Sequence, residues 1–274
     1  MNEAKTYRTL MFSENAPGVG LVRLNRPEQL NAIDVPMVDE LTDLFASLSQ
    51  NETIHIVILT GEGRGFCSGA DLREVVSPAN QAAFADPESF LRLAQERYAS
   101  LILGLRNLPQ PVIAAVNGPA AGAGFALALA SDVRIASPEA YFVASFINIG
   151  LSGGELGTSY FLPRLVGLSR ASEILLTGRK VSAAEAEGMG LVNRVVPRET
   201  LLDEAVALAC KMTGKSVGGL KLTKRVLERN IDAPSLAAAV DLENRNQAML
   251  VFSGDFGRLI VPFAKTPRPG QREG

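Results

Sequence analysis

The sequence is poor in the side chains on which several classes of enzyme depend. Its 274 residues include one histidine, His55, and two cysteines, Cys67 and Cys210. A Ser-His-Asp triad and a histidine-rich metal site both need a suitably placed imidazole, whereas His55 lies in an apolar strand pattern that favours a structural role. Two cysteines cannot form a disulfide framework, which fits a reducing cytosol. We therefore expect no metal site and no serine triad, and we expect Cys67 to be a small buried filler.

The sequence also lacks long runs of one charge or of apolar residues. The net charge is −2 and there is no long basic run, which argues against nucleic acid as the main partner. Residues 1–18 are polar and have no apolar core of the kind found in signal peptides. Residues 114–130 are interrupted by glycines and a proline, so they make a poor membrane span. We expect a cytoplasmic protein without a membrane partner.

Two glycine-rich segments are the most informative feature that is present. Residues 61–72 (GEGRGFCSGADL) and 117–125 (NGPAAGAGF) each follow a short apolar run, 54–60 and 112–116, that predicts a strand. Small residues allow backbone N–H groups to approach a ligand closely. If the two loops meet, they can point two N–H donors at one oxygen, as is needed to stabilise a developing oxyanion.

The order of predicted elements indicates an α/β fold. Strands are expected at 19–24, 132–136, 140–143 and 192–196, in addition to the two before the loops. A helix is expected where apolar residues recur at helical spacing, at Met37, Leu41, Leu44, Phe45 and Leu48. An irregular insert is expected at 78–87, followed by a helix over about 88–105 that ends before two prolines. From residue 158 the pattern is mostly helical, with Ser169 expected as one helix cap and Ser182 with Glu185 as a capping box. We expect an α/β core at 1–197 that contains the site, followed by a helical region at 198–274.

Five separated blocks of this sequence resemble the crotonase (enoyl-CoA hydratase/isomerase) superfamily. They lie between residues 19 and 263 and read LNRPEQLNAI (24–33), GFCSGADL (65–72), PVIAAVNGPAAGAG (111–124), ASDVRIAS (130–137) and GLVNRVVP (190–197). The resemblance implies a spiral of repeated ββα units with a C-terminal helical trimerisation region, assembled as a homotrimer or a dimer of trimers. It implies an acyl-CoA thioester as substrate and no separate cofactor, because CoA is part of the substrate.

The resemblance also implies roles for individual residues. The backbone N–H groups of Ala70 and Ala123 would polarise the thioester carbonyl. Gln29, Leu30 and Ala32 match the segment that lies along pantetheine and adenine. Further candidates for substrate contact are Ser68, Gly69, Asp71, Leu72, Gly122 and Phe146. Asp71 is also expected to anchor its own loop, and weaker candidates for the CoA phosphates are Arg73 and Lys265.

The acidic residues favour an isomerase over a hydratase. Enoyl-CoA hydratases of this superfamily use two glutamates, and the matching positions here are Ala126 and Phe146. Glu155 instead matches the catalytic glutamate of peroxisomal-type Δ3,Δ2-enoyl-CoA isomerases. One carboxylate suffices to remove a proton from C2 and return it at C4, and apolar neighbours should raise the pKa of Glu155.

Other motifs in the sequence are incomplete. The segment GLSGG at 150–154 fits a serine-hydrolase elbow, but no histidine follows it. GAGFAL at 122–127 lacks the third glycine of a dinucleotide fingerprint. The dehalogenase branch of the superfamily uses a tryptophan, and this chain has none. A hydratase-like enzyme with a non-standard acid and a catalytically weak acyl-CoA-binding member both remain open.

Overall fold

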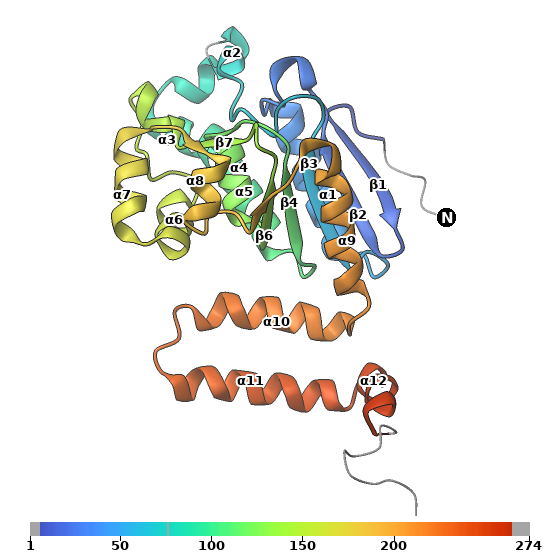
Figure 1. Cartoon of the computed structure of the whole chain (residues 1–274). Coiled ribbons are helices and arrows are strands. Elements are labelled where there is room, and N and C mark those ends of the chain that lie inside the picture. Colours follow the sequence, from blue (N-terminus) through green and yellow to red (C-terminus); the bar gives the residue numbers. More distant parts are fainter. Residues whose placement is uncertain (1–5, 76, 265–274) are drawn as a thin grey trace, which may run out of the picture. The chain divides into compact units, whose positions relative to one another are not determined.

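The computed structural model describes residues 6–75 and 77–264 (Figure 1). They form two compact units, one extending to Met212 and one beginning at Thr213. All strands among the described residues belong to the first unit, and the described part of the second is helical. The expected division after residue 197 falls ahead of helix α9 (Leu201–Thr213) and stays a prediction.

A mixed sheet lies at the centre of the first unit. Its order is β1-β2-β3-β4-β6-β9, in which only β1 and β2 pair antiparallel. The strands are β1 (Leu10–Ala16), β2 (Val19–Leu24), β3 (Ile56–Gly61), β4 (Val112–Val116), β6 (Val133–Ala136) and β9 (Arg194–Val195). Because β3 and β4 are parallel neighbours, the two glycine-rich loops both begin at the carboxyl ends of these strands and leave the sheet on the same side.

A second, smaller sheet completes the repeated units. Its order is β5-β7-β8, with β5 at Ala120–Ala121, β7 at Tyr141–Val143 and β8 at Val181–Ser182. The chain passes from β4 to β5 and from β6 to β7, so successive strands alternate between the two sheets. Helix α5 (Ala123–Ala130) follows the first of these pairs. The mixed α/β core and its strand–strand–helix repeat agree with the predicted fold class.

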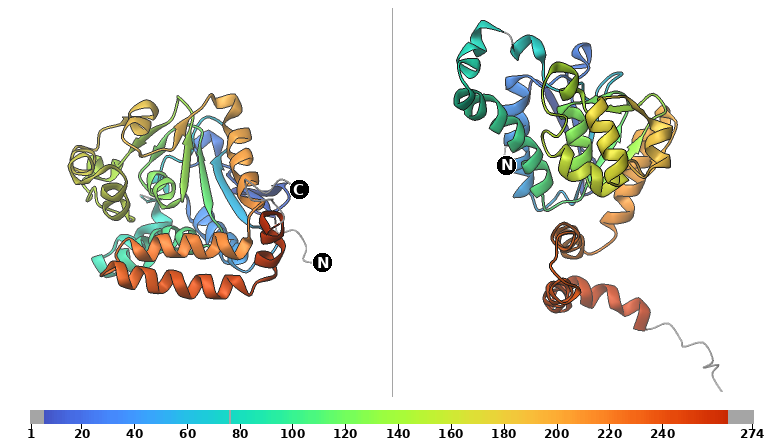
Figure 2. Two further views of the ribbon diagram at one scale, coloured as in Figure 1. Left: turned by 60° about the horizontal axis from the view of Figure 1, so that its bottom comes forward. Right: turned by 90° about the vertical axis from the view of Figure 1, so that its left-hand side faces the viewer.

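Helices cover both faces of the larger sheet. Helix α1 (Val35–Ser49) begins after Asp34, whose side chain accepts a hydrogen bond from the Met37 N–H at 2.9 Å. Its buried face is the predicted one: Met37, Leu41, Leu44, Phe45 and Leu48 are all in the core. The right-hand view of Figure 2 shows α1 and α4 (Glu96–Asn107) on one side of the sheet and α9 on the other. Strand residues that face either side are therefore buried.

The segment before α4 is more regular than expected. Where we predicted an irregular insert and then one helix over 88–105, the structure has a 3-10 helix η2 (Pro78–Phe84), a short helix α3 (Pro87–Phe90) and a π-helix η3 (Leu91–Gln95). Asp86 caps α3 by accepting from the Ser89 N–H at 3.0 Å. The π-helix makes the chain continuous with α4 and ends at Gln95, a half-buried residue.

The remainder of the first unit contains η4 (Ser145–Ile149), α6 (Thr158–Val166), α7 (Leu168–Thr177) and α8 (Ala183–Gly188). The prediction that Ser169 caps a helix is wrong. Gly167, with φ 82°, joins α6 directly to α7, so Ser169 already lies in the first turn. The capping prediction for Ser182 is confirmed, because its Oγ accepts from the Glu185 N–H at 3.2 Å.

The second unit consists of α10 (Val217–Asn230), α11 (Leu236–Val251) and α12 (Gly254–Ala264). Helices α10 and α11 pack side by side (Figure 1). Ser216 and Ser235 cap them through bonds from the N–H groups of Gly219 and Ala238. Large apolar side chains of this unit are exposed in the single chain: Leu227, Ile231, Leu236, Met249, Phe252 and Phe256.

Candidate active site

Two asparagine side chains hold the first glycine-rich loop in shape. Asn31 Nδ2 donates to the carbonyl oxygens of Glu62 and Gly65, each at 2.9 Å. Asn117 Nδ2 donates to the Gly63 oxygen at 2.9 Å. The turn is so tight that a Cβ on Gly61 would stand 2.2 Å from the Gly65 oxygen, which leaves room for glycine alone.

The two loops are joined by backbone hydrogen bonds. The Cys67 N–H donates to the Pro119 oxygen at 3.0 Å, and the Ala121 N–H donates to the Cys67 oxygen at 2.9 Å. A Cβ on Gly124 would lie 2.1 Å from the Cys67 oxygen, so the start of α5 packs directly on the first loop. Cys67 itself is fully buried, and burial raises the pKa of its thiol to about 12. The thiol is therefore a packed filler, as expected, and not a nucleophile.

This junction brings the backbone of Ala70 close to that of Ala123. Gly69 has φ 97°, and a Cβ built on it would lie 2.9 Å from the Ala121 oxygen and 3.5 Å from the Ala123 nitrogen. Ala123 is the first residue of α5 and is 3% exposed. Within residues 6–75 and 77–264, neither the Ala70 nor the Ala123 N–H donates a hydrogen bond to the protein. Ala123 is buried and Ala70 is half-buried. Because N–H groups shielded from water are rarely left without an acceptor, this pair is suited to receive a ligand oxygen.

Glu155 is held at the start of the turn that precedes α6. Its N–H donates to Thr158 Oγ1 at 3.0 Å, and its carbonyl oxygen accepts from the Thr158 N–H at 2.9 Å. The next residue, Leu156, has φ 50°. This turn fixes the backbone from which the half-buried Glu155 side chain projects.

The Glu155 carboxylate has one polar partner that the sequence did not reveal. Gln95 Nε2, at the end of the π-helix, donates to Glu155 Oε1 at 3.0 Å. Burial raises the pKa of Glu155, as expected, and the bond from Gln95 partly opposes that rise. No charged side chain among the described residues contributes to the shift. Partial burial therefore moves the pKa of this carboxyl group toward neutral pH, which is the direction that a general base requires.

The positions of the two hydratase glutamates hold buried apolar side chains. Ala126 is fully buried in α5, and Phe146 lies in η4 with 8% of its surface exposed. A Cβ on Gly122 would be 3.5 Å from Phe146 Cε1, so the phenyl ring stands beside the second loop. Neither side chain can transfer a proton.

The residues predicted to contact CoA form one connected segment with the first loop. Ser68 joins them: its N–H donates to the Leu30 oxygen at 3.0 Å and its Oγ to the Gln29 oxygen at 3.2 Å. Ala32 is nearly buried, whereas Leu72 opens the short helix α2 (Leu72–Val75) and is exposed. Their contacts with a ligand stay predictions.

Asp71 is bound within its own loop, as expected. Its carboxylate accepts from the Arg73 N–H at 3.2 Å and from Arg73 Nε at 3.1 Å. The hydrogen bond from the Arg73 side chain, with a further one from Arg26, holds the pKa of Asp71 below its usual range. Lys265, the weak candidate for a CoA phosphate, lies outside the described residues.

His55 lies next to β3 at the end opposite the glycine-rich loop, beside Gly18, whose oxygen accepts from the His55 N–H at 2.8 Å. Among the residues that the structure describes, no group of three or more His, Cys, Asp or Glu side chains could hold a metal ion. None of the helices in that part of the chain is long and apolar enough to cross a membrane.

Comparison with known proteins places this geometry in a family. The family model described as enoyl-CoA hydratase/isomerase matches residues 14–263. A Mycobacterium bovis protein named as a "probable enoyl-CoA hydratase" is 44% identical over 265 residues, which cover 96% of this chain and 93% of the relative.

Solved structures agree. That of a "probable enoyl-CoA hydratase/isomerase" from Mycobacterium abscessus is 41% identical with a TM-score of 0.86, covering 94% of this chain and 96% of the other. That of a "monofunctional enoyl CoA isomerase" from M. smegmatis is 45% identical with a TM-score of 0.72, covering 85% and 98%. The predicted crotonase-type α/β fold is thereby confirmed, and the chain belongs to the enoyl-CoA hydratase/isomerase family.

Proposed function

We propose that the protein shifts the double bond of a 3-enoyl-CoA to give a 2-enoyl-CoA, with Glu155 as the acid and base. The observation that carries this proposal is the half-buried carboxyl group of Glu155, whose pKa is raised by burial and whose polar partner among the described residues is an uncharged amide. The unpartnered N–H groups of Ala70 and Ala123 support it, because they supply the second requirement of the reaction.

The reaction needs one proton to move and one oxygen to carry charge. The Glu155 carboxylate removes a proton from C2, and the electrons pass through C1 onto the thioester oxygen to give a dienolate. The N–H groups of Ala70 and Ala123 donate to that oxygen, and the N-terminal end of α5 adds a favourable dipole. Protonated Glu155 then returns the proton at C4, which leaves the double bond between C2 and C3.

Hydration by the two-glutamate route finds no support at this site. That route needs one carboxylate to activate water and another to manage the proton, and Ala126 and Phe146 occupy those positions. Hydration by a non-standard acid is the second candidate, because the M. bovis relative is named as a hydratase. Glu155 would then have to activate the water alone.

The other expected properties of the site belong to the same proposal. The segment with Gln29, Leu30 and Ala32 binds the pantetheine and adenine of CoA, and the hydrogen bonds of Gln29 and Leu30 to Ser68, two residues before Ala70, support this assignment. The substrate brings its own CoA, so the reaction needs no further cofactor. A homotrimer or a dimer of trimers is the assembly that we propose.

The test is isomerisation of 3-hexenoyl-CoA by the wild-type chain and by Glu155→Gln. Loss of a positioned acid or base costs about 10²- to 10⁴-fold in rate, so Glu155→Gln should lose at least 10²-fold in kcat. The amide keeps an oxygen that accepts from Gln95, so the fold and KM should change little. The assay follows the appearance of the conjugated thioester.

Glu96→Gln is the matched control, since Glu96 is exposed and adjacent to Gln95. It should retain wild-type kcat. Hydration of 2-hexenoyl-CoA at an ordinary enzymatic rate would favour the second candidate. Tight binding of hexanoyl-CoA without turnover of either enoyl substrate would show a binding protein.

A further inference from the structure

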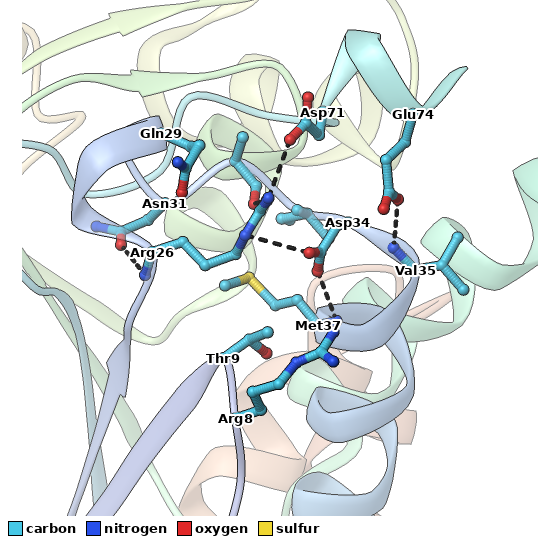
Figure 3. A network of polar contacts seen from close by, with 12 residues as sticks. Arg8, Thr9, Arg26, Gln29, Asn31, Asp34, Val35, Met37, Asp71 and Glu74 are labelled. Atoms are coloured by element: carbon cyan, nitrogen blue, oxygen red, sulfur yellow. Dashed lines mark hydrogen bonds and ion pairs between the residues drawn. The ribbon is translucent and has the colours of Figure 1, made fainter. Parts of the chain in front are cut away.

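We propose that Arg26 is a positioning residue for the oxyanion hole: its guanidinium ties the segment 26–34 to Asp71 and so fixes the direction of the Ala70 N–H. The inference rests on the proposed function only in taking that N–H as a donor to the thioester oxygen. The arrangement is shown in Figure 3.

The Arg26 guanidinium uses all three of its nitrogens. Nη2 pairs with Asp71 Oδ2 at 3.1 Å, Nε pairs with Asp34 Oδ2 at 3.1 Å, and Nη1 donates to the Ala32 oxygen. The side chains are largely buried, with 17% of Arg26, 8% of Asp34 and 5% of Asp71 exposed. One planar cation thus connects three acceptors on two segments that are about 40 residues apart in sequence.

These acceptors surround the backbone that carries Ala70. Ile33 and Ala70 form an isolated parallel bridge, in which the Ile33 N–H donates to the Gly69 oxygen at 2.8 Å and the Asp71 N–H donates to the Ile33 oxygen at 2.9 Å. Ala32 and Asp34 flank Ile33, and Asp71 follows Ala70. Arg26 therefore binds the neighbours of both members of the bridge.

The bridge is in turn tied to a rigid part of the core. Asp34 caps α1 by accepting from the Met37 N–H at 2.9 Å, and Met37 is fully buried. The path from α1 through Asp34 and Arg26 to Asp71 consists of one hydrogen bond and two ion pairs, each shorter than 3.2 Å, and Asp71 is bonded directly to Ala70 in the chain. A hole made of backbone donors has no side chain of its own to orient it, so the direction of each N–H depends on such supports.

Lysine cannot replace this arginine. Its ammonium is a compact charge without the fork of the guanidinium, so it cannot reach the Ala32 oxygen and both carboxylates in the observed geometry. The bridge retains other supports, including the bond from the Val35 N–H to Glu74 Oε2 at 2.8 Å. Arg26→Lys should therefore fold but hold Ala70 less accurately.

The readout must separate positioning of the hole from general stability. Two saturated ligands do so without turnover: [1-¹³C]hexanoyl-CoA, which has a thioester oxygen, and S-hexyl-CoA, its thioether counterpart without one. In the wild-type protein the infrared carbonyl stretch of bound hexanoyl-CoA should fall from its value in water, and the thioester should bind more tightly than the thioether.

Arg26→Lys should lose most of the carbonyl shift and about tenfold of the thioester's binding advantage, while its affinity for S-hexyl-CoA stays the same. Misplacement by about 1 Å can cost 10²-fold in rate, so kcat for 3-hexenoyl-CoA should fall by about that factor with a much smaller change in KM. Asp34→Asn, which weakens the same path, should change each quantity in the same direction and to a smaller extent.

Arg23→Lys is the control, because Arg23 makes a partly exposed pair with Glu62 at 3.1 Å and touches neither Asp34 nor Asp71. It should behave as wild type. The proposal is overturned if Arg26→Lys keeps the carbonyl shift, or if it loses affinity for both ligands equally, which would show a structural role alone. Absence of any carbonyl shift in the wild type would overturn the oxyanion hole itself and the proposed function with it.

Discussion

The surroundings of Glu155 suit it to the proposed role of base. Burial raises the pKa of its carboxyl group, and Gln95, the donor to Oε1 at 3.0 Å, limits the rise. Among the described residues no cation stabilises the carboxylate. A change in burial or in this hydrogen bond should therefore shift the pKa of Glu155, and with it the pH at which the carboxyl group loses its proton.

The pH dependence of kcat/KM tests this balance. The base works when deprotonated, so kcat/KM should rise with pH through the raised pKa of Glu155. Gln95→Met removes the donor that favours the charged form, so the pKa rises further and the acid limb should move to higher pH. The measurement is kcat/KM for 3-hexenoyl-CoA between about pH 4 and 9, and saturation at high pH should recover most of the activity.

Arg92→Gln is the control for this profile, because Arg92 is exposed on the same π-helix. Its acid limb should coincide with that of the wild type. A Gln95→Met profile that moves to lower pH would contradict the assigned direction of the hydrogen-bond effect.

Gly69 is the residue at which shape matters most. Its φ of 97° disfavours any side chain, and a Cβ would stand 2.9 Å from the Ala121 oxygen and 3.5 Å from the Ala123 nitrogen. Gly69→Ala should therefore push the two loops apart and lower kcat/KM by about 10²-fold, the usual cost of a lost oxyanion donor. Gly104→Ala is the comparison. A Cβ on Gly104, in α4, would lie 3.4 Å from Phe45 Cδ2, and alanine has the higher helix propensity, so kcat/KM should stay close to that of the wild type.

The residues that support the site were harder to predict than those that line it. Ala70, Ala123 and Glu155 stand in motifs, so position in the sequence indicated them. Gln95 is 60 residues from Glu155, and nothing in its local sequence marks the contact. Arg26 and Asn31 stand within a motif, yet a spacing cannot show that one reaches Asp71 and the other the Gly65 oxygen.

At the level of elements, the predicted strands at 19–24 and 112–116 are confirmed to the residue. One element that the sequence did not reveal, β1, has five exposed residues in seven and forms the edge of its sheet. Its sequence, LMFSENA, neither alternates between apolar and polar residues nor contains an apolar run of four, so it lacks both patterns by which strands are recognised. Ser169 failed as a cap because a glycine with positive φ can join two helices without one.

The first glycine-rich loop depends on Asn31. This side chain is fully buried, and its amide donates to the carbonyl oxygens of Glu62 and Gly65, the second of which also accepts from Asn117 Nδ2 at 3.2 Å. Asn31 also has φ 56°, a conformation that asparagine tolerates better than alanine. Asn31→Ala should lower the free energy of unfolding by about 2 kcal/mol, measured by urea denaturation. Asn107→Ala, at an exposed position at the end of α4, should change it by less than about 0.5 kcal/mol.

The whole molecule presents an apolar surface on its second unit. Phe252 is 91% exposed in the single chain and Leu236 is 81% exposed, and large apolar side chains exposed on one unit are typical of an interface. We expect association into trimers or dimers of trimers, seen in sedimentation as three or six times the 29.1 kDa chain. Phe252→Asp should shift the distribution toward smaller species, while Asp241→Asn, a substitution of an exposed polar residue, should not.

Among point mutations only a change to proline removes a main-chain N–H, whereas many substitutions add or remove a carboxylate. If the N–H groups of Ala70 and Ala123, which lie on two hydrogen-bonded loops, bind the thioester oxygen as proposed, that binding survives most exchanges of the acid near it. Substitutions in such a scaffold should therefore change the reaction catalysed more readily than they abolish binding of the acyl thioester.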